Sequence, residues 1–391
     1  MERQQTGKNY NIAILGAGIA GVSLVLQGLK QNLWQDQSIL LLGDSLDTGP
    51  NKRISFWAQN KDFVPEFPYL QWDKLAVISH EGNKIPLELD DYVYYSFDAS
   101  AYRQHALTEI RKYKNVEVVE GTVQRIEQHD TYCDISSTQG NYQADYIFQT
   151  IYQKPILAPH SQYFLQHFTG WKIRTDQKFW NNDEAVIMDY RTSQEHGTSF
   201  IYGLPASDDE IFIEYTIFSK NLISKEEYAQ KLSTYLAEVC MVSEYEVIET
   251  EYGVIPMTDH HFSRRDRRIY FLGSAGGDTR GSTGYTFTNT KRTIAHILQA
   301  FKQKTWPKMQ QPKQWKGRFY DAILLHVLAQ GKYPGHALFR DLFKNTRASD
   351  VFRFLDSQSD FKNDLRVMWS LQKWPFIVGM YNTLRLMIWK K

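Results

Sequence analysis

Two kinds of residue in this sequence could carry chemistry: a set of glycines near the start and carboxyl groups within apolar strands. Gly16, Gly18 and Gly21 follow the apolar run 11–15 and precede an apolar segment with helical spacing. In such a strand–turn–helix unit the glycines permit a tight turn, close approach of the backbone to a pyrophosphate, and close packing of helix on strand. The free N–H groups at the helix start favour phosphate. The pattern predicts a dinucleotide site, and the alternative is a purely structural glycine turn.

Glu214 is the carboxyl group with the clearest chemical potential. It interrupts the apolar, β-branched run 211–218. A carboxyl group among apolar neighbours has a raised pKa, which suits a proton donor near neutral pH. Strand alternation could instead point Glu214 to solvent, and the residues alone do not choose. Asp189, followed closely by Arg191, suits either a functional carboxylate or a structural ion pair.

The strand expected over residues 38–42 should end in an acid that binds the ribose hydroxyls of a dinucleotide. Gly43 stands where that acid is usual, and Asp44 follows it. Either Asp44 takes this role or the ribose is bound more weakly. A second glycine cluster, residues 273–278, lies between an apolar strand and a helix. Two such strand ends are typical of flavoproteins in which FAD lies extended across the sheet, and the alternative is an ordinary loop.

Composition excludes several classes of protein. The chain has 45 basic and 44 acidic residues among 391, without the clustered basic face of a nucleic-acid-binding protein. Cys133 and Cys240 are too few and too far apart for a disulfide framework or a zinc site, and we expect buried thiols in a reducing cytosol. His260 and His261 point apart on a strand, so we expect no metal. We also expect no signal peptide and no transmembrane helix.

The patterns predict an α/β fold with a Rossmann-like FAD-binding domain, an inserted antiparallel sheet that forms the substrate domain, and a helical C-terminal part. The first FAD-binding segment should cover residues 9–150, with a small strand insertion near 60–97. The antiparallel sheet should cover 151–260. The second FAD-binding segment should cover 261–304, and the C-terminal helices 316–391.

Several segments, in the expected order, resemble the bacterial lycopene cyclases, a family of FAD-dependent enzymes that close the rings of carotenoids. These segments are Arg53–Trp57, Met188–Asp189, Phe200–Pro205, Phe212–Thr216, Gly253–Met257, Gly273–Asp278 and Ser282–Phe287. In the first of them, Ile54 and Ser55 replace the polar–aromatic centre of the family's loop. The similarity extends from about residue 10 to 380.

The resemblance implies a reaction without net redox change, most simply the conversion of lycopene to β-carotene. A terminal double bond is protonated, the chain closes through a tertiary cation, and a proton is lost. FAD would act in its reduced form, with electrons from NAD(P)H. Glu214 would be the acid or a cation-stabilising carboxylate, and Asp189 the next candidate. The alternatives are a FAD-dependent monooxygenase or dehydrogenase of another apolar substrate, and a non-catalytic carotenoid- or flavin-binding protein.

The glycine clusters and the resemblance together nominate two further sets of residues. The expected cofactor-binding residues are Gly16, Ala17, Gly18, Gly21, Asp44, Arg53, Arg103, Val123, Gly273, Gly276, Gly277, Thr283, Gly284 and Tyr285. The expected substrate-pocket residues, whose aromatic members could stabilise a cation, are Phe56, Trp57, Tyr202 and Pro205.

The C-terminal stretch from Trp374 to Trp389 is apolar and aromatic, contains Arg385, and is followed by Lys390 and Lys391. It is too short and broken to span a bilayer but suits a helix that lies in the membrane interface. A helix docked on the core is the alternative. Because a linear carotene is nearly insoluble in water, we expect a cytoplasmic protein attached peripherally to the inner face of the cell membrane, from which it draws its substrate.

Overall fold

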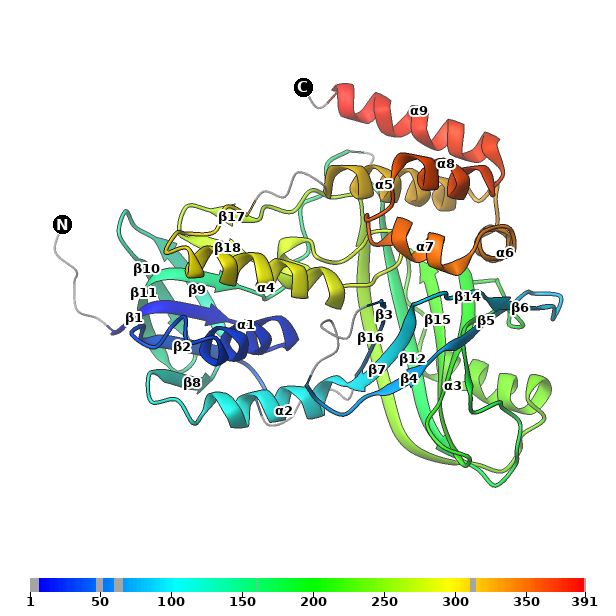
Figure 1. Cartoon of the computed structure of the whole chain (residues 1–391), viewed down its shortest axis with the longest axis horizontal. Helices are drawn as coiled ribbons and strands as arrows, with labels where there is room; N and C mark the ends of the chain where they lie inside the picture. The colour runs from blue at the N-terminus through cyan, green and yellow to red at the C-terminus, as the bar shows by residue number, and fades with distance from the viewer. Residues whose placement is uncertain (1–6, 47–51, 60–65, 160, 310–313, 390–391) are drawn as a thin grey trace.

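The computed structural model describes residues 7–46, 52–59, 66–159, 161–309 and 314–389, and its main parts are two large sheets and a layer of C-terminal helices (Figure 1). Lys390 and Lys391, expected as basic anchors, lie outside the described residues. The mixed α/β class predicted from the sequence is confirmed, with a Rossmann-like sheet, antiparallel strands and a helical C-terminal region.

The first sheet is built on β1 (Lys8–Leu15), which pairs in parallel with β2 (Ile39–Gly43) on one side and β11 (Gly140–Gln149) on the other. Its strand order is β17-β18-β11-β1-β2-β8, and β9 and β10 extend it from β11. The outer strands are β8 (Val116–Glu120), β9 (Val123–Gln128), β10 (Cys133–Ser137), β17 (Arg265–Asp266) and β18 (Ile269–Phe271). Continuous apolar runs suit β1 and β2 because both of their faces are buried.

Three helices accompany this sheet. They are α1 (Ile19–Lys30), α2 (Ala99–Ile110) and α4 (Phe287–Lys302). The sequence offers Asp98 or Ser100 as the cap of α2, and the Asp98 side chain takes this role by accepting a 2.8 Å hydrogen bond from the N–H of Ala101. In Figure 1 the three helices run along the same part of the molecule as β1 and β2.

The second sheet has seven strands in the order β16-β12-β15-β14-β13-β5-β6, antiparallel except where β13 meets β5. The strands are β5 (Lys74–Ile78), β6 (Lys84–Leu87), β12 (Tyr163–Arg174), β13 (Glu184–Asp189), β14 (Thr198–Pro205), β15 (Glu210–Ser219) and β16 (Glu246–Thr258). The helix α3 (Lys225–Thr234) and the π-helical turn η2 (Tyr235–Val239) pack on it, and Ser224 caps α3 as expected.

A small sheet joins the two parts of the molecule. Its strands are β3 (Arg53–Ala58), β7 (Val93–Asp98) and β4 (Leu70–Trp72). The segment near 60–97 is therefore shared: β4 and β7 build this small sheet, whereas β5 and β6 enter the seven-stranded one.

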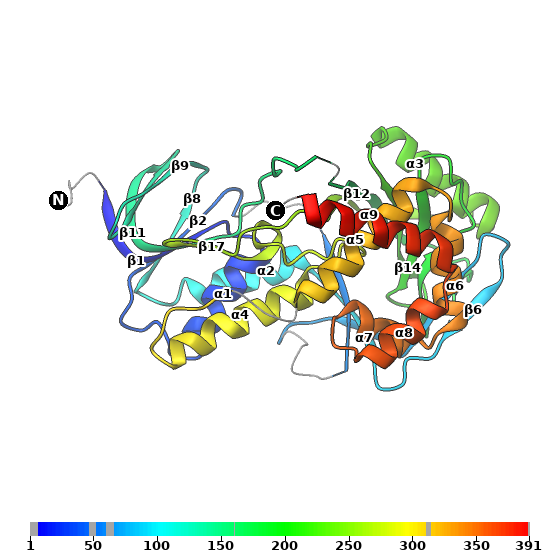
Figure 2. The same cartoon turned by 90° about the horizontal axis from the view of Figure 1, so that it is seen from above.

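The C-terminal helices cover one end of the seven-stranded sheet (Figures 1 and 2). They are α5 (Gln314–Gln330), α6 (Gly335–Asn345), α7 (Ala348–Leu355), α8 (Phe361–Trp369) and α9 (Lys373–Trp389). The sequence analysis did not distinguish α8, which Asp360 caps through the N–H of Asn363. Within the described part of the chain, no helix combines the length and apolar character needed to cross a membrane.

Candidate active site

The first glycine turn has the geometry that its sequence predicts. Gly16 has a φ of +103°, which favours glycine, and a Cβ on Gly21 would lie only 2.0 Å from the carbonyl oxygen of Gly16. A Cβ on Gly18 would instead meet nothing within 4 Å. Gly16 and Gly21 therefore build the turn, while Gly18 keeps its outer side open at the start of α1.

The end of β2 explains why the expected acid is displaced. A Cβ on Gly43 would lie 2.6 Å from the backbone nitrogen of Ala17, so no side chain fits there. Asp44, the next residue, is exposed. Gly121 donates a 2.9 Å hydrogen bond to the carbonyl of Gly43, so the connection leading to Val123 lies beside this strand end. Asp44 and the 121–123 connection therefore both follow the backbone contact at the end of β2.

The second glycine cluster is a short turn, η3 (Gly273–Gly276), held by a buried carboxylate. Asp278 accepts a 2.6 Å hydrogen bond from the N–H of Gly273 and a 2.8 Å hydrogen bond from the Thr293 hydroxyl, and it pairs with Arg264. Gly273 borders the central cavity, whereas Gly276 and Gly277 pack within the turn. The structure therefore brings part of the predicted cluster to the cavity.

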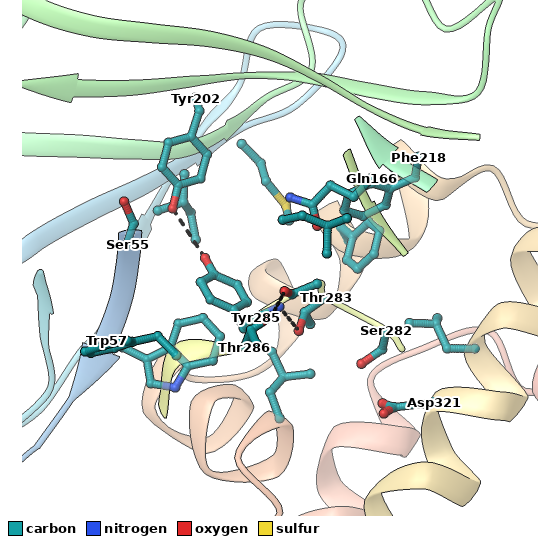
Figure 3. Close-up of a pocket in the computed structure, with 18 of the residues that line it drawn as sticks. Ser55, Trp57, Gln166, Tyr202, Phe218, Ser282, Thr283, Tyr285, Thr286 and Asp321 are labelled. Atoms are coloured by element: carbon teal, nitrogen blue, oxygen red, sulfur yellow. Dashed lines mark hydrogen bonds between the residues drawn. The ribbon is translucent and has the colours of Figure 1, made fainter. Parts of the chain in front are cut away.

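A cavity of about 930 Å³ extends from the two glycine turns across the seven-stranded sheet to the C-terminal helices. Gly18–Ala20 and Gly273–Ser274 border one part of it, and side chains of α5 to α9 border another. Figure 3 shows the polar and aromatic residues around its middle, with Tyr202 facing Tyr285 and Ser282 facing Asp321. Most of the remaining lining is apolar, from Phe168, Phe200, Leu204, Phe218, Leu338, Phe339, Leu342, Phe343 and Phe376.

Two carboxyl groups reach this cavity from one face of the sheet. Strand pairing places Gly170 of β12 directly between Glu214 of β15 and Glu251 of β16. Residues that are paired across neighbouring strands share a face of the sheet. A Cβ on Gly170 would lie 2.3 Å from the ring of Phe212, so that ring covers the glycine. Both glutamates border the cavity, and the sequence analysis did not identify Glu251.

Each glutamate has its own hydrogen-bond partner. The Thr216 hydroxyl donates to Glu214 at 2.5 Å, and the backbone N–H of Arg53 donates to Glu251 at 2.9 Å. Burial raises the pKa of Glu214 above the usual carboxyl range. Burial, and then the charge of Glu214, also raise the pKa of Glu251. Because two close carboxylates disfavour double ionisation, the pair retains a proton near neutral pH.

Aromatic residues form another wall of the cavity. The Tyr285 hydroxyl lies 3.3 Å from that of Tyr202, which it faces in Figure 3. It also lies 3.1 Å from the hydroxyl of Tyr94, so three tyrosines from distant parts of the chain are linked. Trp57 lies 4.4 Å from Tyr285 between ring centres and stacks on Phe352 of α7 at the same distance. Trp57 and Tyr202, which were expected in the substrate pocket, border the cavity, and so does Tyr285, which was expected to bind the cofactor.

Two predicted pocket residues lie elsewhere. Phe56 is 2% exposed and packs on Phe287 with a ring-centre distance of 4.9 Å, because strand alternation turns it away from the side of Trp57. Pro205 is buried at the end of β14, and its neighbour Leu204 borders the cavity instead. The assignment of Phe56 and Pro205 to the pocket lining is therefore corrected.

Asp189 also lies away from the cavity. Its carboxylate is fully buried and binds the Arg191 guanidinium, with a shortest contact of 2.6 Å, and the Tyr235 hydroxyl, also at 2.6 Å. Ile187 and Met188, which precede it on β13, border the cavity instead. The structure supports the ion-pair alternative for Asp189 and removes it as a catalytic candidate.

The two arginines predicted to bind the cofactor carry unsatisfied nitrogen atoms. Nε and Nη2 of Arg103 on α2 are buried without a hydrogen-bond partner in the described structure, and so is Nε of Arg53. Tyr102, which precedes Arg103, contacts Ser23 of α1 at 3.0 Å between hydroxyl oxygens. Arg53 borders the cavity beside Glu251. Buried guanidinium nitrogens without partners suit an anionic ligand. No group of three or more side chains suited to a metal ion occurs in the described regions.

A Rossmann-like sheet with two glycine turns, joined to a sheet that forms a large apolar cavity, defines the class of flavoprotein-like α/β proteins. Three solved structures share this fold. One is a geranylgeranyl bacteriochlorophyll reductase-like protein from Thermoplasma acidophilum, with 10% identity and a TM-score of 0.67 over 96% of this chain and 99% of that chain. Another is a flavoprotein/dehydrogenase from Cytophaga hutchinsonii, with 10% identity and a TM-score of 0.61 over 98% of this chain and 100% of that chain. The third is a halogenase in complex with FAD, with 12% identity and a TM-score of 0.55 over 88% of this chain and 79% of that chain.

The family of the chain follows from its sequence. Residues 11–384 match the family described as lycopene cyclase protein, which is nearly the whole chain. The protein therefore belongs to the lycopene cyclase family, and the resemblance predicted from its motifs is confirmed. No individual curated protein matches the chain.

Proposed function

We propose that the protein is a carotenoid cyclase that closes the ends of a linear carotene, most simply lycopene to β-carotene. The observation that carries this proposal is the position of Glu214. Its desolvated carboxyl group faces a cavity that is otherwise mostly apolar, large and lined by aromatic rings. Such a cavity suits a long hydrocarbon, and a protonated carboxyl group in it suits proton transfer to a double bond.

The proposed reaction conserves protons and electrons. The Glu214 carboxyl group gives its proton to the terminal double bond, which leaves a tertiary cation on the neighbouring carbon. A second double bond attacks this cation, the ring closes, and loss of a ring proton restores a double bond. The cavity excludes water, which would otherwise capture the cation. The faces of Trp57, Tyr285 and Phe212 can stabilise positive charge.

FAD is the cofactor that the residues fit. The open side of Gly18 leaves room for a pyrophosphate at the N-terminus of α1, and Arg103 and Arg53 offer unpaired donors. The cavity lining near the second glycine turn includes Thr283, Gly284 and Tyr285. The flavin end of the cofactor would lie beside these residues. A solved halogenase of the same fold is in complex with FAD. When bound, FAD reduced by NAD(P)H would supply an electron-rich ring that stabilises nearby positive charge.

The substrate enters from a membrane surface through the α8–α9 face, defined by the exposed side chains of Phe361, Leu365, Trp369, Trp374, Ile377, Met380, Tyr381 and Leu384. Four of these residues, Leu365, Trp369, Ile377 and Met380, also border the cavity. The apolar face is thus continuous with the proposed substrate site. Lys373 lies 4.4 Å from the centre of the Trp369 ring, the basic–aromatic pairing that suits a headgroup region.

The last helix, α9, was expected either to lie in the membrane interface or to dock on the core, and each alternative describes one of its faces. Gly379 brings α9 against α5, where a Cβ would lie 3.1 Å from the Ile323 carbonyl, and Thr383 is buried. The opposite face carries Trp374 and Tyr381, which are 69% and 64% exposed. The helix docks by one face and offers the other to the membrane. This arrangement supports the proposal that the protein attaches peripherally to the inner face of the cell membrane.

Pigment analysis tests the proposed function. The chain is expressed in a host that accumulates lycopene, and the extracted carotenoids are separated and identified. Cyclic carotenes without added oxygen are the expected result. Oxygenated or desaturated products would support a monooxygenase or dehydrogenase instead. Unchanged lycopene, with flavin or pigment bound to the purified protein, would support a non-catalytic binding protein.

A further inference from the structure

The proposed reaction uses one proton and releases another at a different carbon. An active site for it therefore needs a donor and an acceptor placed at two positions along the closing ring. Glu214 supplies the donor in the proposed function. The rest of the cavity lining contains one more carboxyl group on the same face of the sheet, that of Glu251.

The placement of Glu251 relative to Glu214 depends on the glycine that lies between them. Gly170 is paired with Glu214 on one side and with Glu251 on the other. The backbones of the two glutamates are therefore two strand spacings, roughly 9–10 Å, apart. Gly170 carries no side chain, and the Phe212 ring, which comes within 2.3 Å of where a Cβ on Gly170 would lie, covers this position between them. The two carboxyl groups flank an aromatic surface over which a ring could close.

The surroundings of the two carboxyl groups differ. Glu251 is 4% exposed, and its acceptor oxygen binds the backbone N–H of Arg53, a group that can only donate. Lys52 and Arg53 are its nearby positive charges. Glu214 binds the Thr216 hydroxyl, which can donate or accept. Besides these groups, the titratable hydroxyls of Tyr94 and Tyr285 face Glu214. Once Glu214 has given up its proton, its negative charge raises the pKa of Glu251 and makes that carboxylate a stronger base.

We propose that Glu251 is a second catalytic carboxylate, which accepts the proton lost from the ring after Glu214 has donated its own. This inference rests on the proposed function and assigns the base in it. The C–H bond that breaks leaves its electron pair as the new ring double bond, and the proton moves to the Glu251 carboxylate. Transfer of this proton back to Glu214 restores the pair with one proton. No oxidant or reductant is consumed.

Product analysis of glutamine variants separates the two roles. Purified flavin-containing protein, supplied with lycopene in liposomes, is compared with Glu214→Gln, Glu251→Gln and the control Glu246→Gln, an exposed position on the same strand. Glu214→Gln should leave the substrate linear. Glu251→Gln should be about 100-fold slower, in the range for loss of a general base. It should also yield rings with a displaced double bond or an added hydroxyl group, because the cation then loses a different proton or captures water. Glu246→Gln should match the wild type.

Two results would overturn the assignment. One is a Glu251→Gln variant that forms only the wild-type product at the wild-type rate. The other concerns a Glu251→Gln variant that is folded and binds flavin but forms no product. In that case Glu251→Asp, which restores a carboxylate, should recover cyclisation, and an inactive Glu251→Asp variant would contradict the proposal. A wild-type protein that leaves lycopene unchanged would instead overturn the proposed function itself.

Discussion

The two large sheets prepare their sites by opposite means. At the parallel sheet the important residues are glycines, and the site consists of backbone N–H groups and of space that side chains would fill. At the antiparallel sheet the important groups are side chains, two carboxyls held in an apolar cavity across a single glycine. The first arrangement suits a large anionic cofactor that supplies its own chemistry. The second suits a substrate with no polar group to bind, for which the protein must supply the proton.

This difference has an energetic side. The glycine turn costs little folding free energy. Gly16 and Gly21 allow the backbone to pack closely, and the strand ends beside them remain hydrogen-bonded. Two desolvated carboxyl groups on strands that flank β12 cost stability whenever they ionise. The antiparallel sheet therefore carries a stability cost that its proposed catalytic role would explain. The parallel sheet carries no comparable cost.

The largest expected effect comes from removing the proton donor. Glu214→Gln keeps the shape of the side chain and its hydrogen bond to Thr216 but has no proton of suitable acidity. Cyclisation should fall by about 10²–10⁴-fold, the usual range for loss of an acid–base group. Flavin binding should not change, because Glu214 belongs to the other sheet. Carotenoid analysis and the flavin absorption spectrum of the purified variant measure the two quantities.

A control on the same strand sharpens that comparison. Glu210 of β15 binds Lys172 at 2.7 Å on the surface and does not border the cavity. Glu210→Gln makes the same change from carboxyl to amide on the same strand, so its cyclisation rate should remain within about twofold of the wild type. Near-normal cyclisation by Glu214→Gln would remove Glu214 from the reaction.

The next largest effect distinguishes two glycines of one turn. A Cβ at Gly18 would meet no atom within 4 Å, so Gly18→Val should fold with nearly wild-type stability but fill the space proposed for the pyrophosphate. A valine at Gly21 would collide with the Gly16 carbonyl, and overpacking of this kind costs about 1–3 kcal/mol or more. Thermal unfolding and FAD titration should therefore separate the variants: Gly18→Val loses flavin affinity, and Gly21→Val loses stability. Tight FAD binding by Gly18→Val would contradict the proposed cofactor site.

Local patterns predicted the fold and the cofactor end well, because each feature there depends on neighbours in the sequence. The strand–glycine–helix unit and the caps at Asp98 and Ser224 needed only a few adjacent residues. Glu251 could not be assigned in the same way, since its partner Glu214 belongs to a strand that reaches it only through Gly170. An acid two residues before Gly253, in a segment that resembles the family, was the available signal.

The errors have related causes. Aromatic residues beside Trp57 were all candidates for the cavity wall, but alternation along β3 sends Phe56 into the other core. A carboxylate at a strand end suited either catalysis or an ion pair, and only the packing of η2 places Tyr235 against Asp189. The contribution of α5 to α9 to the cavity depends on tertiary packing, which no local pattern reports.

A smaller effect is expected at the α8–α9 face. Replacing Trp369 and Trp374 together by serine removes two exposed indoles without altering the contact of Gly379 with α5. Binding to liposomes should weaken about tenfold, and cyclisation of liposome-embedded lycopene should fall, while flavin binding stays unchanged. Ile156→Ser is the matched control, because Ile156 is 97% exposed outside these helices. Unchanged liposome binding by the double variant would contradict a membrane role for this face.

The smallest effect tests the stability cost of the carboxyl pair. In the unfolded chain Glu251 ionises near its ordinary pKa of 4.5, whereas burial and the charge of Glu214 raise its pKa in the folded protein. Between these two pKa values the folded state binds more protons than the unfolded state, so the stability of the wild type falls as the pH rises. Glu251→Gln has no such group but keeps an acceptor for the Arg53 N–H. Its Tm relative to the wild type should therefore rise between about pH 5 and about pH 8, on the order of 2 °C for each kcal/mol. Glu246→Gln, exposed on the same strand, should show no such rise. A Tm difference between Glu251→Gln and the wild type that does not change with pH would mean that Glu251 is solvated as an ordinary carboxylate, and the contrast between the two sheets would then disappear.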